Sequence, residues 1–304
     1  MIIKRLKNLI DRWKRIPANI TKIQEAIGRI ESRQIQDFGI DKIDFSEFKV
    51  YSQWGEDGII QFILKFIPIK NKLFIEFGVE DYTESNTRFL LKNNSWSGLV
   101  LDGNKNYIDY IINDTNVYWA HNLKAQNIFI TKDNINEVIN SNGIPEDIGL
   151  LSIDIDGNDY WIWDSITTVK PRIVISEFNA LFGPKEKVSI PYESNFVRTE
   201  KHFSNIYYGC SLAALEYLAL KKGYSLVATN TAGNNAFFVR NDLVSGFKIL
   251  NAADAYKGVH FREAKNEIGV LTYINIYEQR KLISDFKVVD VETNEIKRIQ
   301  DLMF

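Results

Sequence analysis

Gly78 and Asp102 have the residue types and spacing of a nucleoside-binding site. Gly78 follows the apolar stretch 74–77, and a glycine at that point lets a ligand approach the backbone closely. Asp102 lies 24 residues further on, after a second apolar stretch, where a carboxylate can accept hydrogen bonds from both ribose hydroxyls. Tyr82 stands where a pyrophosphate cradle would have a further glycine. The pattern therefore favours a ligand with a ribose but no diphosphate, and S-adenosylmethionine is the commonest such ligand.

Three aspartates, Asp154, Asp156 and Asp159, follow another apolar stretch at 149–153. Desolvated carboxylates need partners, and ligands of parallel α/β sheets bind at the carboxyl ends of the strands. Asp154 and Asp156 share one face of an extended segment, so we predict that they form a catalytic or substrate site. The alternative is that these acids cap and begin the next helix, and Asp159 favours this alternative.

Glu177 and Asn179 end the next strand-like stretch, at 172–177. With Asp154 they would form an oxygen-rich pocket, and such oxygens suit Mg²⁺ or another hard divalent cation. Catechol O-methyltransferase has a similar acid, acid, amide arrangement on the corresponding strands. Metal binding by Asp154, Glu177 and Asn179 is therefore one hypothesis, and a metal-free hydrogen-bonding site for a polar substrate is the other.

Two histidines are candidate general bases, because imidazole titrates near neutral pH. His121 follows a predicted strand at 116–120, near the expected cofactor edge. His202 lies in the long stretch 178–207, and loops of that length are often lids or binding elements.

The short run 51–58 contains Gln53, two glycines and two acids. This composition indicates a loop that folds over a ligand. Capping of the following helix by Ser52 or Asp57 is the structural alternative.

A mainly parallel α/β sheet must position these residues, because strand-like and helix-like patterns alternate from about residue 50. The predicted strands are 72–78, 98–102, 116–120, 149–154, 172–177, 224–229 and 235–240. The predicted helices are 56–66, 84–94, 104–113, 133–141, 158–166 and 210–222. The link between the last two strands is too short for a crossover, so we expect that pair to be antiparallel.

The composition is that of a globular protein, with 304 residues, 45% apolar and 25% charged. A formal net charge of −2 gives no argument for nucleic-acid binding, and we expect none. The single cysteine, Cys210, excludes an internal disulfide and suits a reducing cytoplasm. The sequence has no apolar run of the ~18 residues that a spanning helix needs. We therefore expect a cytoplasmic protein.

Residues 1–36 differ from the rest because their apolar residues recur at alternating steps of four and three, which is a heptad pattern. These residues are Ile2, Leu6, Leu9, Trp13, Ile16, Ile20, Ile23, Ile27 and Ile30. Pro17 should kink this helix or divide it in two. We expect residues 1–36 to form a homo-oligomer. The alternatives are contact with the inner face of a membrane through the basic residues 1–15, and packing on the chain's own domain.

Several short motifs together resemble the FkbM-like S-adenosylmethionine-dependent methyltransferases, especially a bacterial branch found beside surface-polysaccharide genes. The matching stretches are 52–58, 74–80, 84–88, 96–103, 152–161, 177–180, 208–212 and 235–240. The resemblance implies a Rossmann-like class I methyltransferase sheet, mostly parallel with a terminal antiparallel hairpin. The methyltransferase domain would span 37–242, between the helical segment 1–36 and a C-terminal extension, 243–304. In that extension 271–284 reads as a helix, and 286–291 with 296–299 as a hairpin, without evident chemistry.

The resemblance also implies roles for single residues. Glu76 and Gly78 would hold the methionine part of S-adenosylmethionine, Asp102 would hold the ribose, and Gln53 and Asn86 would lie beside them. Methyl groups would pass to oxygen on a small polar acceptor, such as a sugar or a modification of a capsule or other surface polysaccharide.

Two other functions stay open from the sequence. Asp154-Ile155-Asp156 has the D-x-D form that metal-dependent glycosyltransferases use to hold a nucleotide sugar. Alternatively, the protein is a non-catalytic oligomeric scaffold, in which the heptad helix assembles partners.

Overall fold

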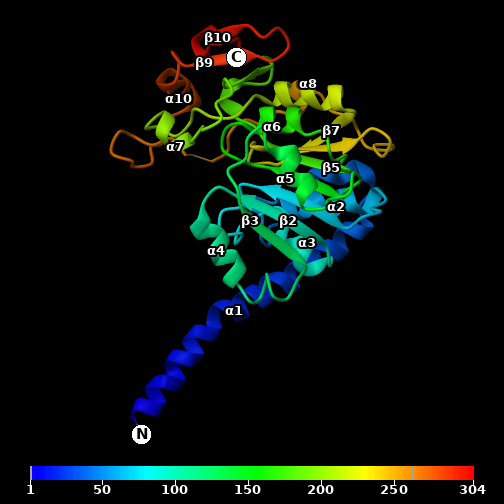
Figure 1. The fold of residues 1–304 in the computed structure, drawn as a ribbon, viewed down its shortest axis with the longest axis vertical. Coiled ribbons are helices and arrows are strands. Elements are labelled where there is room, and N and C mark those ends of the chain that lie inside the picture. The colour runs from blue at the N-terminus through cyan, green and yellow to red at the C-terminus, as the bar shows by residue number, and fades with distance from the viewer. Residues whose placement is uncertain (1, 262) are drawn as a thin grey trace.

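A seven-stranded sheet forms the centre of the molecule (Figure 1). The computed structural model describes residues 2–261 and 263–304. The strands are, in spatial order, β3 (Leu123–Asn127), β2 (Ser97–Asp102), β1 (Leu73–Phe77), β4 (Leu150–Ile153), β5 (Ile173–Glu177), β8 (Asn235–Arg240) and β7 (Tyr224–Thr229). The first five are parallel, and β8 is antiparallel to both β5 and β7. The predicted Rossmann-like fold class, with its terminal antiparallel pair, is confirmed.

Helices cover both faces of this sheet, because successive strand residues point to opposite faces and both sets are apolar. One layer consists of α2 (Glu56–Phe66), α3 (Arg88–Asn93) and α4 (Lys105–Asn113), and the other of α5 (Ile135–Ser141), α6 (Asp159–Ser165) and α8 (Leu212–Lys222). Phe74 and Val100 pack with the first layer, whereas Ile75 and Phe77 pack with the second. The two cores hold the sheet in place, so the ends of its strands are fixed positions for functional side chains.

The predicted strand at 116–120 is wrong. The backbone amides of Val117 and Tyr118 donate to the Asp114 carbonyl oxygen, which makes this segment a helical turn. The third strand is β3, which pairs with β2 at the edge of the sheet. Its sequence, Leu-Lys-Ala-Gln-Asn, lacks β-branched and aromatic residues, so pairing with β2 and not intrinsic propensity makes it a strand.

The C-terminal segment packs on the domain through a second, three-stranded sheet. Its strands are β6 (Val188–Ser189), β9 (Lys287–Asp290) and β10 (Ile296–Arg298). The short helices elsewhere in the chain are α7 (Arg198–Lys201), α9 (Ala252–Ala255), α10 (Ile276–Leu282), η1 (Ile35–Asp37), η2 (Ile40–Phe45), η3 (Ala180–Phe182) and η4 (Ile299–Asp301). The predicted terminal hairpin is confirmed, because β9 and β10 are antiparallel neighbours. β9 also pairs with β6, which ties the tail to the long stretch after β5.

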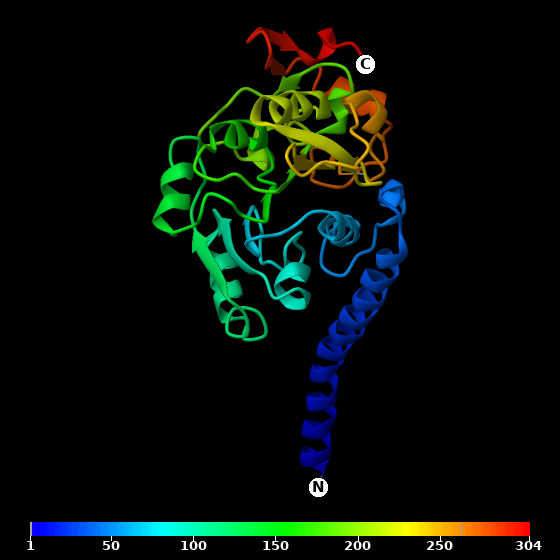
Figure 2. The ribbon, with the colours of Figure 1, turned by 90° about the vertical axis from the view of Figure 1, so that its right-hand side faces the viewer.

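The N-terminal helix α1 (Ile2–Gln34) runs unbroken through Pro17, so the predicted division at this proline is wrong. It extends away from the body, and the two chain ends lie at opposite ends of the molecule (Figures 1 and 2). Among the described helices, none is both long enough and apolar enough to cross a membrane. The end of α1 nearest the body is fixed by Glu25, which accepts a hydrogen bond of 2.5 Å from the Tyr51 hydroxyl.

Five isoleucines on α1 do not face the body. Ile16, Ile20, Ile23, Ile27 and Ile30, here called the isoleucine face, are 47–60% exposed. The body-facing side carries Gly28, where an added Cβ would lie 2.3 Å from Val50 Cγ2. The helix therefore packs on its own domain through polar and small residues and leaves this apolar face in solvent. The alternative of packing on the chain's own domain therefore holds for the side of α1 that carries Glu25 and Gly28, and it leaves the isoleucine face uncovered.

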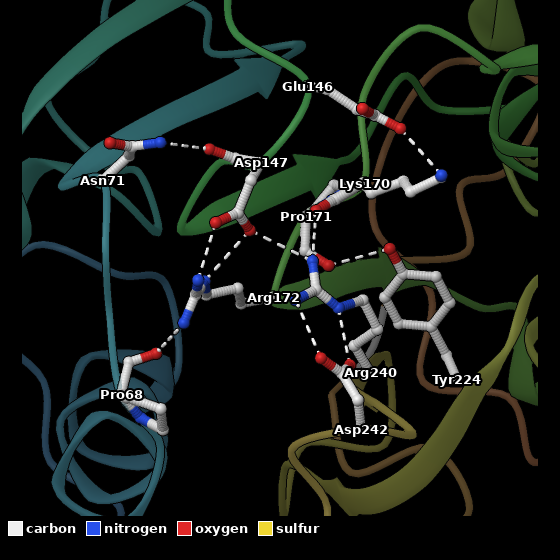
Figure 3. Close-up of polar contacts among 10 residues, drawn as sticks. All are labelled: Pro68, Asn71, Glu146, Asp147, Lys170, Pro171, Arg172, Tyr224, Arg240 and Asp242. Carbon is white, nitrogen blue, oxygen red and sulfur yellow. Dashed lines mark hydrogen bonds and ion pairs between the residues drawn. The ribbon is translucent and has the colours of Figure 1, made fainter.

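Acids and arginines pair at the amino edge of the sheet, where the parallel strands begin (Figure 3). Arg172 donates to both carboxylate oxygens of Asp147, at 3.0 and 2.6 Å, and to the Pro68 carbonyl oxygen at 2.5 Å. Arg240, at the end of β8, contacts Asp147 at 3.1 Å and binds Asp242 through two hydrogen bonds. Hydrogen bonds from Arg172 and then from Arg240 hold the pKa of Asp147 below its usual range.

Candidate functional site

The carboxyl edge of the sheet, where the parallel strands end, collects most of the predicted site residues. Gly78 follows β1, Asp102 ends β2, Asp154 follows β4 and Glu177 ends β5. Asn235, which was not predicted as a site residue, begins β8 at the same edge, because the register of the antiparallel pair sets it opposite Glu177. Two adjoining cavities open here, named below the Asp102 cavity and the Glu177 cavity.

Gly78 lies between the two cavities and lines both of them. Its φ of +67° is in the left-handed region that favours glycine. A Cβ at this position would stand 1.7 Å from the backbone oxygen of Asp154, an impossible contact. The glycine is therefore required twice, by the turn after β1 and by the close approach of the end of β4.

The Asp102 cavity has a volume of about 450 Å³ and walls of mixed character. Its polar side includes Gly78, Asp102 and Asn104, and its apolar and aromatic side includes Tyr107 and Phe129. Phe129 is 48% exposed, so a ring face is open to a ligand. A flat heterocycle with a sugar attached fits such walls, because the ring can stack on aromatic groups while the sugar meets polar groups.

Asp102 is held in place by backbone amides. One of its carboxylate oxygens accepts from the amide of Glu80 at 2.9 Å, and the other from the amide of Asn104 at 2.7 Å. Each oxygen keeps a second lone pair, which can accept from a hydroxyl. Burial raises the pKa of Asp102, although the two backbone hydrogen bonds oppose this effect. The arrangement suits the predicted role of binding a ribose.

Glu76 organises the loop that follows β1. Its carboxylate accepts hydrogen bonds from the Ser85 hydroxyl at 2.8 Å, the Asn86 amide at 2.8 Å and the Thr87 hydroxyl at 2.5 Å. The side chain of Asn86 in turn donates to the Ser152 hydroxyl at 3.0 Å. The Glu177 cavity is lined by Glu76, Asn86 and Gln53, three residues that we predicted to lie beside one another. Tyr82 does not line either cavity, because it is fully buried in the core.

The run 51–58 forms the tight turn before α2. Asp57 accepts hydrogen bonds from the amides of Val50, Tyr51 and Ser52, and the Ser52 hydroxyl accepts from the Asp57 amide. Of these contacts, only the one from Ser52 satisfies an amide of the first turn of α2, because the N-cap residue itself is Gly55. Gln53, on the outside of the turn, lines the Glu177 cavity.

The Glu177 cavity, of about 280 Å³, is lined mainly by polar side chains. Its acids are Glu76, Glu80, Glu84, Asp154, Asp156, Glu177 and Glu263. Burial, together with the charges of Asp156 and Asp159, raises the pKa of Asp154 well above its usual range. Burial and the charge of Asp154 do the same for Glu177. The cavity therefore holds more carboxylates than it can keep charged without a cation.

Arg198, on α7, is the basic residue among the described residues that line this cavity. Its guanidinium binds Asp156 at 2.5 Å and also binds Glu263. It lies over the ring of Tyr208, 3.5 Å from the ring centroid. Arg198 is thus tied to the outer acids of the cavity.

Two predicted site groups lie elsewhere. His121 precedes β3 and so sits toward the amino edge, because the strand predicted before it is a turn. His202 contacts the Ser204 hydroxyl at 2.5 Å and packs on Phe203 and Phe286. Neither histidine lines either of the two cavities. We therefore drop both as general bases.

Asn179 is occupied by the backbone. Its amide nitrogen donates to the carbonyl oxygens of Ile206 and Tyr208, each at 3.0 Å, and its oxygen accepts from the Leu181 amide. Asn179 does not line the Glu177 cavity. The acids whose oxygens come together are Asp154, Asp156 and Glu177, so Asp156 takes the place that we predicted for Asn179. Asp159 begins α6, as one of its predicted roles requires, and it holds the preceding turn by accepting from the amides of Ile155 and Gly157, while the N-cap residue is Asn158.

Several residues of the two cavities were missed. Glu80 lies two positions after Gly78, so the motif itself could have indicated it. Asn235 could have been found from the antiparallel pair, which sets the start of β8 beside the end of β5. Arg198 and Glu263 have no signal in the sequence, because they come from a loop and a tail. Phe261 and Glu263 line the Glu177 cavity, so the extension 243–304, in which the sequence shows no evident chemistry, reaches the candidate site.

Comparisons with known proteins add little to this site. No family model matches the chain, and no curated protein sequence matches it. The N-terminal domain of EvdMO1, solved with SAH bound, has 11% identity and a TM-score of 0.41, covering 70% of this chain and 94% of that one. M. capricolum TrmK in complex with S-adenosyl-homocysteine has 12% identity and a TM-score of 0.34, covering 59% and 65%. The O-methyltransferase from Bacillus cereus in complex with SAH has 14% identity and a TM-score of 0.34, covering 55% and 72%. At these scores the likeness assigns no function, and the FkbM-like resemblance stays a prediction.

Proposed function

We propose that the protein is an S-adenosylmethionine-dependent methyltransferase that acts on oxygen of a small polar acceptor. The supporting observation is the junction of the two cavities. Gly78, Glu80, Asp154, Asp156 and Arg198 line both, so a ligand in one cavity lies against a ligand in the other. Methyl transfer needs such contact, because an in-line displacement requires the two reactants to be held together and aligned.

The cofactor would occupy the Asp102 cavity and the junction. Its ribose hydroxyls would donate to Asp102, and its adenine would stack on the open face of Phe129. The methionine part would pass Gly78 toward Gln53, Glu76 and Asn86, where acids and amides can bind its ammonium group. Its sulfonium methyl group would then face the Glu177 cavity.

The acceptor would lie in the Glu177 cavity. Its hydroxyl oxygen forms a bond to the methyl carbon while the carbon–sulfur bond breaks, and sulfur keeps that electron pair as neutral S-adenosylhomocysteine. The hydroxyl proton must leave, and Asp154 and Asp156 are the proposed groups to accept it. A cavity rich in carboxylate and amide oxygens accepts many hydroxyl hydrogens but repels anions, which favours a sugar over a phosphorylated acceptor.

Calorimetry with S-adenosylhomocysteine tests the cofactor assignment. The intact chain should bind it, and Asp102→Ala should weaken binding about 100-fold, the loss expected for two hydrogen bonds to a charged group. Asp109→Ala is the matched control, because Asp109 is exposed on α4 and pairs only with Lys105. Near-normal affinity of Asp102→Ala would refute the ribose assignment, and absence of binding by the intact chain would refute the proposed function.

A nucleotide-sugar transferase remains the competing function, because Asp154 and Asp156 keep the D-x-D form. A thermal-shift screen of the intact chain separates the two. S-adenosylmethionine and S-adenosylhomocysteine should raise the melting temperature, and nucleoside diphosphate sugars should not. A shift with nucleotide sugars alone would reverse the assignment.

We also propose that the isoleucine face binds a second copy of α1. Its five residues follow the four-three spacing of a coiled-coil seam, and the seam is a narrow stripe. A helix that lies in a membrane surface has a wider apolar face. Because α1 is anchored to the body by Glu25 and Gly28, on another side, the seam is free to pair.

Light scattering of the full chain tests this association. Replacing Ile20 and Ile27 together with Gln should reduce the mass to that of a monomer, since both side chains are about half exposed and the fold does not need them. Lys22→Gln, an exposed change outside the seam, is the control. A monomeric intact chain that floats with anionic vesicles would show that a membrane covers this face instead.

A further inference from the structure

The oxygens of Asp154, Asp156 and Glu177 converge at one point of the Glu177 cavity. One ligand oxygen from each residue lies within 4.8 Å of the other two. Two of these residues follow β4 and the third ends β5, so the neighbouring strands fix the group. Oxygens that bind one ion at ~2.0–2.6 Å each lie at most about 5 Å apart, and these three oxygens meet that limit.

The hydrogen bonding of Glu177 adds a second kind of observation, and Asn235, outside the cluster, repeats it. Glu177 is only 7% exposed, and its Oε2 atom has no hydrogen-bond partner among residues 2–261 and 263–304. A buried carboxylate oxygen without a partner is costly, because nothing replaces the water that it lost. An atom of this kind that faces a cavity indicates that a ligand supplies the missing contact.

Asn235 contributes a second buried oxygen that has no hydrogen-bond partner among the described residues. It is 4% exposed, and its Oδ1 atom also lacks a partner within the described part of the chain. Its nitrogen donates to Glu56 at 2.9 Å, and Glu56 is fixed by the amides of Trp54 and Gly55. The amide is therefore turned so that the oxygen, not the nitrogen, is left for the cavity that Asn235 lines beside Glu177.

The charges in the cavity indicate the sign of that ligand. Arg198 forms its ion pairs with Asp156 and Glu263, and among the described residues it forms none with Asp154 or Glu177, whose pKa values stay raised although its charge opposes the effect. Two buried acids and an amide oxygen all donate electron pairs, so the ligand must supply a positive charge or hydrogen-bond donors, and two neighbouring carboxylates favour the charge. Carboxylate and amide oxygens at short range are the ligands of hard divalent ions.

We propose that Asp154, Asp156, Glu177 and the amide oxygen of Asn235 bind a divalent cation of the Mg²⁺ class. This proposal rests on the proposed function for its role: the ion holds the acceptor hydroxyl beside the cofactor methyl group and lowers the pKa of that hydroxyl. A carboxylate that binds the ion through one oxygen keeps the other to take the proton. The ligand set differs from the one expected from sequence, because Asp156 and Asn235 replace Asn179.

Titration of the metal-free full chain with Mn²⁺ tests the site, with bound ion counted by electron paramagnetic resonance. We expect one tight site per chain, and competition by Mg²⁺. Glu177→Gln should weaken Mn²⁺ binding at least tenfold, and Asn235→Ala several-fold. The matched control is Glu84→Gln, which removes the same charge from the same cavity but is exposed and pairs with Lys49.

Two results would overturn the proposal. The first is failure of the intact chain to bind Mn²⁺ at millimolar concentration. The second is an equal loss of Mn²⁺ affinity in Glu84→Gln and Glu177→Gln, which would show that the cavity attracts the ion only through its total negative charge and that Glu177 does not ligate it. S-adenosylhomocysteine binding, measured in EDTA, checks that each variant is folded. It also separates the two ideas, since cofactor binding without Mn²⁺ binding would reject the ion and keep the methyltransferase.

Discussion

The two edges of the central sheet use the same kinds of residue in opposite ways. At the amino edge, Asp147 and Asp242 are bound by Arg172 and Arg240, and hydrogen bonds from these arginines lower the pKa of both acids (Figure 3). At the carboxyl edge, burial and mutual repulsion raise the pKa of Asp154 and Glu177.

The difference separates acids that stabilise the fold from acids that await a ligand. Paired acids at the amino edge have a lower free energy when charged, so they contribute to folding at neutral pH. Holding the acids of the carboxyl edge close together raises the free energy of the folded state. A ligand-binding function at that edge accounts for this cost. The four predictions below test this contrast between the edges.

The largest effect should come from Gly78→Ala at the carboxyl edge. The new Cβ would stand 1.7 Å from the Asp154 backbone oxygen, so the end of β4 must move and both cavities must change. We expect S-adenosylhomocysteine affinity to fall more than 100-fold, and the free energy of unfolding to fall by about 3 kcal/mol.

Gly143→Ala is its control, because Gly143 also has a positive φ, of +68°, but no atom lies within 4 Å of its added Cβ. This change should cost about 1 kcal/mol of stability and leave affinity unchanged. Equal affinity losses in the two variants would contradict the role given to the close approach at Gly78.

The second effect belongs to the amino edge. Arg172→Met removes the hydrogen bonds to Asp147 and Pro68 and leaves a partly buried acid with one arginine fewer. We expect a loss of about 2 kcal/mol in urea unfolding, since removing one partner of a partly buried pair costs less than in a fully buried pair. Cofactor affinity should not change, and a tenfold loss would show that the two edges are not independent.

The third prediction is a gain in the free energy of unfolding, whereas the first two are losses. Glu177 has a raised pKa in the folded state, so the folded state binds its proton more tightly than the unfolded chain does. Stability therefore falls as pH rises from the unfolded pKa of about 4 to the folded pKa, and the cost is complete above that value. Glu177→Gln removes the charge, and in EDTA it should raise the free energy of unfolding at pH 8 by on the order of 1 kcal/mol.

Below pH 4 this gain should vanish, because the wild-type Glu177 is then protonated in both states. The measurement is urea unfolding of both proteins across the pH range. A stability loss at pH 8 would mean that the Glu177 carboxylate has a partner of its own and would remove the contrast between the edges.

The smallest effect is expected for Asp242→Asn. Asp242 is 60% exposed and binds Arg240, which keeps its contact with Asp147 after the change. Exposed pairs contribute about 0.5 kcal/mol, and that contribution exists at neutral pH and is lost as pH falls through the lowered pKa of Asp242. Thermal unfolding at pH 7 and pH 3 should show a larger difference at pH 7 than at pH 3, and a loss above 2 kcal/mol would mean that this pair matters as much as the one at Asp147.

Much of the carboxyl edge follows from sequence, because each strand carries its own polar terminus. Gly78, Asp102, Asp154 and Glu177 are recognisable one strand at a time, and parallel strands bring such ends together. The predicted strand 116–120 is wrong because its apolar residues lie in a largely exposed turn, in which Val117 is buried but Trp119 is 85% exposed. His121 was misplaced for the same reason.

The remaining site residues are fixed by contacts between distant segments. Asn179 resembles a metal ligand in sequence, but the backbone of 206–208 takes up its amide. Arg198 and Glu263 come together only when a loop helix and the tail fold over the sheet edge. No local pattern encodes such contacts. For α1, the heptad pattern predicted an apolar stripe, but only the structure tells which side of the helix meets the body.

Phe261 and Glu263, which the C-terminal segment contributes to the Glu177 cavity, do not line the Asp102 cavity. Part of the wall that would meet the acceptor thus lies more than 150 positions after Asp102, which would meet the ribose. A change confined to Phe261 and Glu263 can therefore alter the acceptor site without replacing any residue that lines the Asp102 cavity. On the ribosome, Asp102 emerges well before Phe261 and Glu263, so the acceptor wall is completed later than the ribose site begins to form.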